Sequence, residues 1–304
     1  MPPRPLLLLL LTLSLTACQQ PPSPPPSTPA APALQAVKSP VLVVAHRPPS
    51  ATPRRIVSLA PNITELLFAM GLGDRVVGVT RFCDFPAQAR ALPKIGGFVD
   101  PDLEAIVAQR PDLVLGMTSP GNEVLPQTLN RADLPHIFLR MDTLAQTVEA
   151  TELLGAMLHV PAQGARQAGE LRAGLKAAAA AAAPAPTALF VLGHDPIVVA
   201  GAGTFGHELL ELAGARNAAA ALPSAYPVLD AEGVLALEPA IIIDATMTPD
   251  QGAPLLSFWG KWAALPAVRD GRVHRFSDPS LLRPGPRLPE ALHRIRAAVE
   301  APAR

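Results

Sequence analysis

Cys83 has the most reactive side chain in the stretch TRFCDFPAQA, which spans Thr80 to Ala89. A thiol beside Asp84 could serve as a nucleophile, as a metal ligand or as a small buried filler. The chain has one other cysteine, Cys18, and no second thiol stands near Cys83 in sequence. We therefore predict that Cys83 is a small, mostly buried loop residue and that Asp84 braces the loop.

The common signatures of hydrolases and metalloenzymes are missing from the sequence. It contains no HExxH, CxxC or GxSxG motif. The glycines of residues 71–78 follow a predicted helix rather than a strand, so they form no dinucleotide-binding loop. His207 and Glu208 have no second histidine at metal-ligand spacing. We predict a protein that is not an enzyme and has no catalytic residues, with a tethered enzyme as a remote alternative.

The charge balance argues against nucleic acid as a partner. The 304 residues include 25 Lys and Arg against 25 Asp and Glu, which gives a net charge of +0. Without a basic excess, the chain has little to offer a phosphate backbone.

The first 17 residues have the character of a secretory signal peptide. Arg4 precedes an apolar run from Leu6 to Leu15, which is shorter than the about 20 residues that span a bilayer. The sequence LTAC that ends at Cys18 resembles a bacterial lipobox, in which cleavage precedes the cysteine and its sulfur carries a diacylglycerol. A signal peptide without a special cysteine is the alternative.

Residues 18–52 are rich in proline and hold few groups that could build a core. Such a segment favours extended polyproline II conformations and predicts a tether. Together with a lipid on Cys18, it predicts an extracytoplasmic protein, in the periplasm or at the cell surface, held to a membrane.

Strands and helices alternate from residue 54 onward. Asn62 and Asp100 stand where they could cap helices, Glu65 could complete a capping box, and Gly71 could end the first helix. Such alternation predicts α/β lobes with parallel sheets covered on both faces. The predicted strands include 55–60, 75–80, 112–117, 136–141, 188–193 and 197–201, and the predicted helices include 62–73, 100–111, 122–133, 142–159, 162–183 and 204–214.

Two pairs of segments resemble each other and occur in the same order. Residues 102–116 (DLEAIVAQRPDLVLG) match residues 230–244 (DAEGVLALEPAIIID), and residues 65–71 (ELLFAMG) match residues 208–214 (ELLELAG). A chance match between two helix–Pro–strand units is the alternative. The repeat favours two similar lobes.

We therefore predict an N-terminal lobe at 53–142 and a C-terminal lobe at 187–304. Residues 143–186 would join them by helices that include a long Ala-rich one, because alanine is the best helix former and no breaker intervenes before Pro184. A cleft between two lobes is a favoured ligand site.

At these residues the chain resembles the substrate-binding proteins of bacterial ABC importers whose lobes are joined by one long helix. Within this class III family, the cobalamin-binding and iron-chelate-binding members are most similar. The resemblance covers nearly all of residues 54–296 and is carried by RIVSLAPNITELLFAMG, DFP, GGFVDPDLEAIVAQRPDLVLG, YPVLDAEGVLALEPAIII and RPGPRL.

The resemblance implies a rigid monomer with two Rossmann-like lobes. It would catch a metal chelate between them and deliver it to an ABC permease dimer. A cobalt corrinoid such as cobalamin is the first expectation, and haem or an iron–siderophore is the alternative. A direct zinc or manganese receptor is more remote, and no resident metal or cofactor is expected.

The resemblance also implies ligand-facing residues. Positions that carry mostly aromatic residues in cobalamin-binding relatives fall on Phe85, Phe98, Met117 and Tyr226, of which three depart from the usual tyrosine or tryptophan. Arg283 matches a ligand-facing cation that suits carboxylates or amides.

Loops at the carboxyl ends of parallel strands should also face the cleft. They include Pro61 and His194. The His194 imidazole could ligate a haem iron or a cobalt, or it could be a hydrogen-bonded loop histidine.

Two surface glutamates complete the set of predicted sites. Glu104 and Glu232 match the positions at which relatives dock with arginines of the permease. The alternative is that each is a solvated first-turn acid favoured by the helix dipole.

Overall fold

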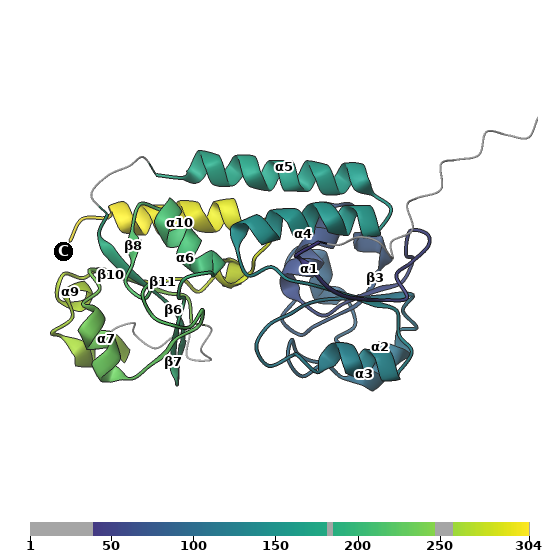
Figure 1. Ribbon diagram of the computed structural model, residues 1–304, viewed down its shortest axis with the longest axis horizontal. Helices are drawn as coiled ribbons and strands as arrows, with labels where there is room; N and C mark the ends of the chain where they lie inside the picture. Colours follow the sequence, from purple (N-terminus) through teal and green to yellow (C-terminus); the bar gives the residue numbers. More distant parts are fainter. Residues whose placement is uncertain (1–38, 181–184, 247–257, 304) are drawn as a thin grey trace, which may run out of the picture. The chain divides into compact units, whose positions relative to one another are not determined.

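Two β-sheets organise the chain in this computed structural model, which describes residues 39–180, 185–246 and 258–303 (Figure 1). The predicted signal peptide, the lipidation site Cys18 and residues 18–38 of the predicted tether lie outside the described residues. Residues 37–304 group into one unit, to which everything below refers.

The N-terminal sheet has the strand order β1-β5-β4-β2-β3. Four of its strands are parallel to their neighbours, and β1 runs antiparallel to β5. The helices α1 (Pro61–Ala69), α2 (Leu103–Ala108) and α3 (Leu125–Arg131) alternate with the strands. The strands are β1 (Leu42–His46), β2 (Ile56–Ser58), β3 (Val76–Val79), β4 (Leu113–Met117) and β5 (His136–Leu139).

Strand β1 corrects the predicted extent of the tether. The prediction includes residues 42–46 in the tether that reaches residue 52, but they form the edge strand of the N-terminal sheet. The Ser39 hydroxyl also donates a hydrogen bond to Glu149 at 2.7 Å. Alternation of half-buried and exposed side chains in LVVAH is typical of an edge strand, and the prolines nearby masked that signal.

The C-terminal sheet has the order β11-β10-β6-β7-β9, with β8 paired to β6 outside this path. Strands β11, β10, β6 and β8 run parallel to their partners, whereas β7 is antiparallel to β6 and β9. Each lobe is therefore a mostly parallel α/β sheet, as predicted. The strands are β6 (Thr187–His194), β7 (Ile197–Val199), β8 (Arg216–Asn217), β9 (Val228–Leu229), β10 (Ile241–Asp244) and β11 (Val273–Arg275).

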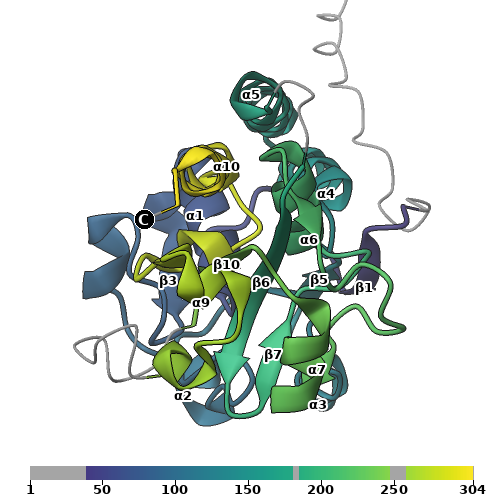
Figure 2. The ribbon, with the colours of Figure 1, turned by 90° about the vertical axis from the view of Figure 1, so that its left-hand side faces the viewer.

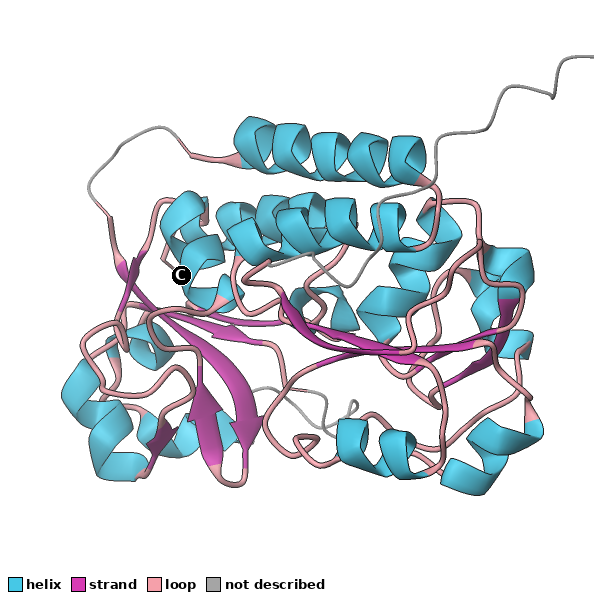
Figure 3. Cartoon of the chain, turned by 45° about the vertical axis from the view of Figure 1, so that its right-hand side comes forward, coloured by secondary structure: helices cyan, strands magenta, loops and turns pink. Residues whose placement is uncertain are grey.

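Both faces of the C-terminal sheet are covered, as Figure 3 shows. Side chains alternate along β6, so Phe190 joins the core beneath α6 (Phe205–Leu212) and α10 (Leu288–Glu300). Leu189 and Val191 face the opposite core, which is completed by α7 (Ala231–Leu237) and α9 (Pro266–Arg269). Because successive side chains of a strand point to opposite faces of the sheet, β6 contributes residues to both cores.

A pair of helices connects the lobes. The helix α4 (Leu144–Met157) begins in a capping box made by Thr143 and Gln146, and α5 (Pro161–Ala178) returns beside it. The helix α5 packs against both α4 and α10 (Figures 1 and 2). It ends at Ala178, several residues before the predicted end. Of the helices within the described ranges, none is long and apolar enough to cross a bilayer.

The internal repeat is present in the backbone as well as in the sequence. Asp102 and Asp230 each cap the amino end of a helix, and Gly71 and Gly214 both adopt positive φ after the matched helices α1 and α6. The matched residues that precede the two prolines also share positive φ, at Arg110 (47°) and Glu238 (43°). Two matched segments therefore share caps and turn geometry, which supports the prediction of similar lobes.

Two predicted helix caps are wrong. Asp100 pairs with Arg81 instead of capping α2, and the cap is Asp102. Asn62 lies inside α1, which starts at Pro61 without a side-chain cap. The Asn62 amide is buried and donates to the Pro284 carbonyl at 3.0 Å. The Asn62 side chain therefore bonds to Pro284, far along the chain, instead of capping the helix in which it lies.

The close approach of α4 and α5 yields a stability prediction. A Cβ added at Gly164 would lie 2.7 Å from the Gly155 Cα, so Gly164→Ala should push the helices apart. Overpacking of this kind costs about 1–3 kcal/mol. Gly169→Ala, in the same helix with open space around it, should instead stabilise the protein by about 0.5–1 kcal/mol. Urea denaturation of both variants measures the difference, and equal effects would contradict it.

Candidate functional site

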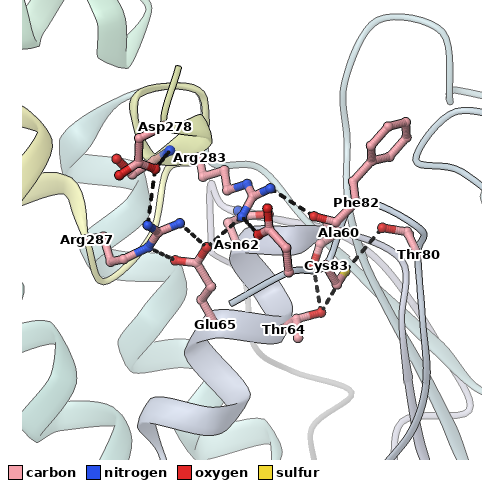
Figure 4. Close-up of polar contacts among 12 residues, drawn as sticks. Ala60, Asn62, Thr64, Glu65, Thr80, Phe82, Cys83, Asp278, Arg283 and Arg287 are labelled. Atoms are coloured by element: carbon pink, nitrogen blue, oxygen red, sulfur yellow. Dashed lines mark hydrogen bonds and ion pairs between the residues drawn. The ribbon is translucent and has the colours of Figure 1, made fainter. Parts of the chain in front are cut away.

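A buried carboxylate joins the two lobes. Glu65 in α1 is only 2% exposed, and it accepts hydrogen bonds from two arginines of the C-terminal lobe (Figure 4). Arg287 donates Nε to Oε2 at 2.9 Å and Nη2 to Oε1 at 2.7 Å, and Arg283 donates Nη1 to Oε1 at 3.1 Å. The Arg287 contact is bidentate, the strongest geometry for an arginine–carboxylate pair.

The two arginines have further partners. Arg283 also donates to Asp84 at 2.5 Å and to the Phe82 carbonyl at 2.8 Å. Arg287 also pairs with Asp278 at 3.3 Å. Burial alone would lower the pKa of Arg287, but the hydrogen bond and charge of Glu65, with Asp278 and Asp84, raise it above its ordinary value. We call Glu65, Asp84, Asp278, Arg283 and Arg287 the interlobe ion cluster.

The sequence RPGPR explains why the cluster forms. Pro284 and Pro286 restrict the backbone between the two arginines, and both guanidinium groups reach α1. Gly285 sits against that helix, since an added Cβ would lie 3.3 Å from the Asn62 Cβ. The short segment therefore docks closely on the start of α1.

The repeat places a second glutamate at the lobe junction. Glu208 in α6 corresponds to Glu65 in α1, and its Oε2 accepts a hydrogen bond from the Leu144 N–H at 2.6 Å. Leu144 is the first residue of α4, so Glu208 satisfies one of the free N–H groups there. The Phe205 N–H also donates to the Asp142 carbonyl.

The arrangement differs from the expectation that Arg283 is a ligand-facing cation. Its side chain is 8% exposed and already has three partners in the N-terminal lobe. Arg287 stands at the amino end of α10, makes no cap hydrogen bond there and joins the cluster. The missed signal is Glu65, a lone charge within the apolar sequence ITELLFAM.

His194 lies in an internal hydrogen-bond network. Its Nε2 is 2.9 Å from Oδ2 of the fully buried Asp244, and its ring stacks on Phe258 with centroids 3.8 Å apart. Asp244 also accepts from Trp259 and Thr246. Burial alone would raise the pKa of Asp244, but these hydrogen bonds and the one from His194 lower it to about 2. Of the two expectations for His194, this geometry matches the hydrogen-bonded loop histidine and leaves Nε2 unavailable to a metal.

Three predicted ligand residues lie together where the parallel strands of the N-terminal sheet have their carboxyl ends. Pro61 follows β2, Phe85 follows β3 and Met117 ends β4, at the carboxyl ends of neighbouring parallel strands. Phe85 is 45% exposed, and the Arg287 guanidinium lies over its ring at 4.4 Å from the centroid. An open pocket of about 360 Å³ adjoins this contact and is lined by Asp84, Phe85, Arg90, Asp278, Pro279, Arg287 and Glu290.

Phe98, Met117 and Tyr226 are half-buried. Burial and the nearby charge of Asp142 raise the pKa of Tyr226 above its ordinary value. The predicted set thus divides into partly accessible, mainly apolar residues and two residues, His194 and Arg283, that are engaged internally.

Cys83 is a packed residue, as predicted. It is 1% exposed, and its sulfur lies 3.1 Å from the hydroxyls of both Thr64 and Thr80. Within the described ranges, no group of three or more His, Cys, Asp or Glu is arranged to hold a metal ion.

Removing the Glu65 carboxylate should destabilise the protein strongly. Glu65→Ala removes the carboxylate shared by the buried Arg283 and the half-buried Arg287, and loss of one member of a buried ion pair costs about 3–5 kcal/mol. Glu290→Ala removes an exposed partner of Arg294 and should cost about 0–1 kcal/mol. The free energy of unfolding in urea measures both, and a small loss for Glu65→Ala would contradict a supporting role for the cluster.

Comparison with known proteins places this fold. A family model described as "Periplasmic binding protein" matches residues 56–279. The vitamin B12-binding protein of Pectobacterium carotovorum is 28% identical over 257 residues, which are 83% of this chain and 90% of the relative.

Two solved structures share both fold and sequence. The periplasmic heme-binding protein RhuT of Roseiflexus sp. RS-1 in apo form is 30% identical with a TM-score of 0.71, and covers 81% of this chain and 97% of its own. The periplasmic vitamin B12-binding protein BtuF of Vibrio cholerae is 26% identical with a TM-score of 0.70. The match covers 82% of this chain and 97% of the BtuF chain. The family consists of binding proteins rather than enzymes, which agrees with the prediction from sequence and indicates an extracytoplasmic location. This chain belongs to the periplasmic binding protein family.

Proposed function

We propose that this protein captures a cobalt corrinoid such as cobalamin between its lobes and delivers it to an ABC permease. The observation that carries the proposal is the set of partly accessible apolar residues at the carboxyl ends of β2, β3 and β4, in a fold shared with B12-binding relatives. In α/β folds, ligands bind at such edges. Apolar walls with few polar groups suit a large organic chelate.

The state of His194 removes one candidate axial ligand for haem iron. A haem receptor commonly supplies an axial ligand to iron, whereas a corrinoid can arrive with its metal already ligated. The His194 Nε2 is held by Asp244, so this imidazole is not free to bind iron through that atom. Haem or an iron–siderophore remains the alternative because heme-binding proteins share the fold.

Membrane attachment and the monomeric state belong to the same proposal. A lipid on Cys18 would hold the protein to a membrane, and the Pro-rich segment from residue 18 would serve as the tether. Since β1 begins at Leu42, the tether is shorter than predicted.

Glu104 and Glu232 support the proposed delivery step. Both are exposed and lie in the first turn of matched helices, two residues after the capping Asp102 and Asp230. The helix dipole alone could favour an acid there. A glutamate at the same position in both lobes fits a permease that is built from two similar subunits, each with a basic docking site.

Titration with candidate ligands tests the ligand assignment. The purified protein should bind cyanocobalamin in calorimetry more tightly than hemin or ferric siderophores. Phe85→Ala should weaken that binding about tenfold by removing an exposed ring. His194→Gln should leave it nearly unchanged. A Soret shift with hemin that depends on His194, without cobalamin binding, would contradict the proposal.

Charge reversal tests the delivery step. The double variant Glu104→Arg with Glu232→Arg should bind cyanocobalamin as the wild type does, because both side chains are exposed and neither belongs to the proposed ligand site. It should lose uptake of labelled cobalamin in cells, since like charges would face the permease arginines. Normal uptake by this variant would end the docking proposal.

A further inference from the structure

Exposed apolar side chains gather around the two proposed docking helices. Eight large hydrophobic residues are exposed among those that the structure describes, and four of them lie within five residues of Asp102 or Asp230. They are Val99 (53%) and Val107 (48%) near α2, and Val228 (64%) and Leu235 (41%) near α7. Single exposed apolar residues are ordinary, so the observation used here is their recurrence beside the capping aspartate in both lobes.

One pair of these apolar residues, Val107 and Leu235, occupies matched places in the two lobes. Val107 lies three residues after Glu104, and Leu235 lies three residues after Glu232, so each acid and its apolar neighbour share one helix face. Ile106 and Val234, one residue before each, are fully buried and anchor the helices in their cores. The repeat therefore aims the same pair outward from both lobes.

Both helices lie on the side of the molecule opposite α5. Figures 1 and 2 show α2 and α7 at the bottom and α5 at the top. The two patches can thus face one partner surface at the same time.

We propose that each docking site is a composite of an acid and an apolar flank, formed by Glu104 with Val99 and Val107 in one lobe and by Glu232 with Val228 and Leu235 in the other. The occupant is a membrane permease of two like subunits, each offering a basic side chain within an apolar rim. This inference rests on the proposed function and adds to it the chemistry of the partner surface.

The two parts of each patch have different physical roles. The glutamate steers association and fixes orientation, and its contribution falls as salt screens it. The apolar flank gains free energy when it leaves water, and this contribution persists at high salt. Two repeated patches engage one partner together, so weakening both should lower affinity more than weakening one.

The test uses the full mature protein and the ABC transporter that imports its ligand in the same bacterium, reconstituted in nanodiscs. Docking affinity is measured by surface plasmon resonance at low and high salt. Val107→Ser with Leu235→Ser should weaken docking at least about tenfold at both salt concentrations. Glu104→Gln with Glu232→Gln should weaken it mainly at low salt. The matched control Val43→Ser, at a 38% exposed valine in β1, should dock as the wild type does.

Each outcome decides between the two proposals. Unchanged docking by the apolar double variant, with loss by the glutamate variant, would overturn this inference and leave the proposed function standing. Unchanged docking by both would overturn the delivery step as well. If the apolar variant instead reduced self-association in sedimentation and left docking intact, the patches would be contacts between copies of this chain. Calorimetry with cyanocobalamin should give the same affinity for all variants, and a loss there would also overturn the inference.

Discussion

The carboxylate of Glu65 is buried among charged groups from both lobes, and the joint between the lobes depends on it. Charges leave water at a high cost, which is recovered only when their partners are complete and well placed. Glu65 receives three hydrogen bonds from two arginines, and those arginines reach Asp84, Asp278 and a backbone carbonyl. Because each partner is fixed by several bonds, the cluster tolerates little relative movement of the elements it joins.

The two pairs of matched segments have different roles, one at the joint between the lobes and one at the surface. The first copy of the ELL segment turns Glu65 toward the C-terminal lobe, and the second turns Glu208 toward the start of α4. The Asp-x-Glu segments point outward instead, with Glu104 exposed in α2 and Glu232 exposed in α7. The repeated segments thus supply both the joint that holds the lobes and the surface proposed to meet a permease.

The joint also bears on the proposed ligand site. Arg287 lies over the ring of Phe85, so a residue of the C-terminal lobe helps to hold an exposed ring at the edge of the N-terminal sheet. A ring held in this way loses little freedom on binding, which favours affinity for a flat ligand face. In the C-terminal lobe, Asp244 holds His194 in a comparable manner, and there the result is a packed and satisfied imidazole.

The sequence by itself determined the alternation of strands and helices and the two-lobe repeat, because periodicity and turn residues act over a few positions. It also indicated that Cys83 is buried, since no second thiol stands near it in the chain. It did not reveal that residues 42–46 form a strand, since β1 depends on a partner, β5, about ninety positions away in the chain. It also did not reveal the tertiary partners of Asn62, Glu65, Arg283 and His194. Each has a side chain that can cap a helix, bind a ligand or pair internally, and local sequence does not distinguish these uses. Only the tertiary structure decided among them, because their partners lie between 50 and 222 residues away along the chain.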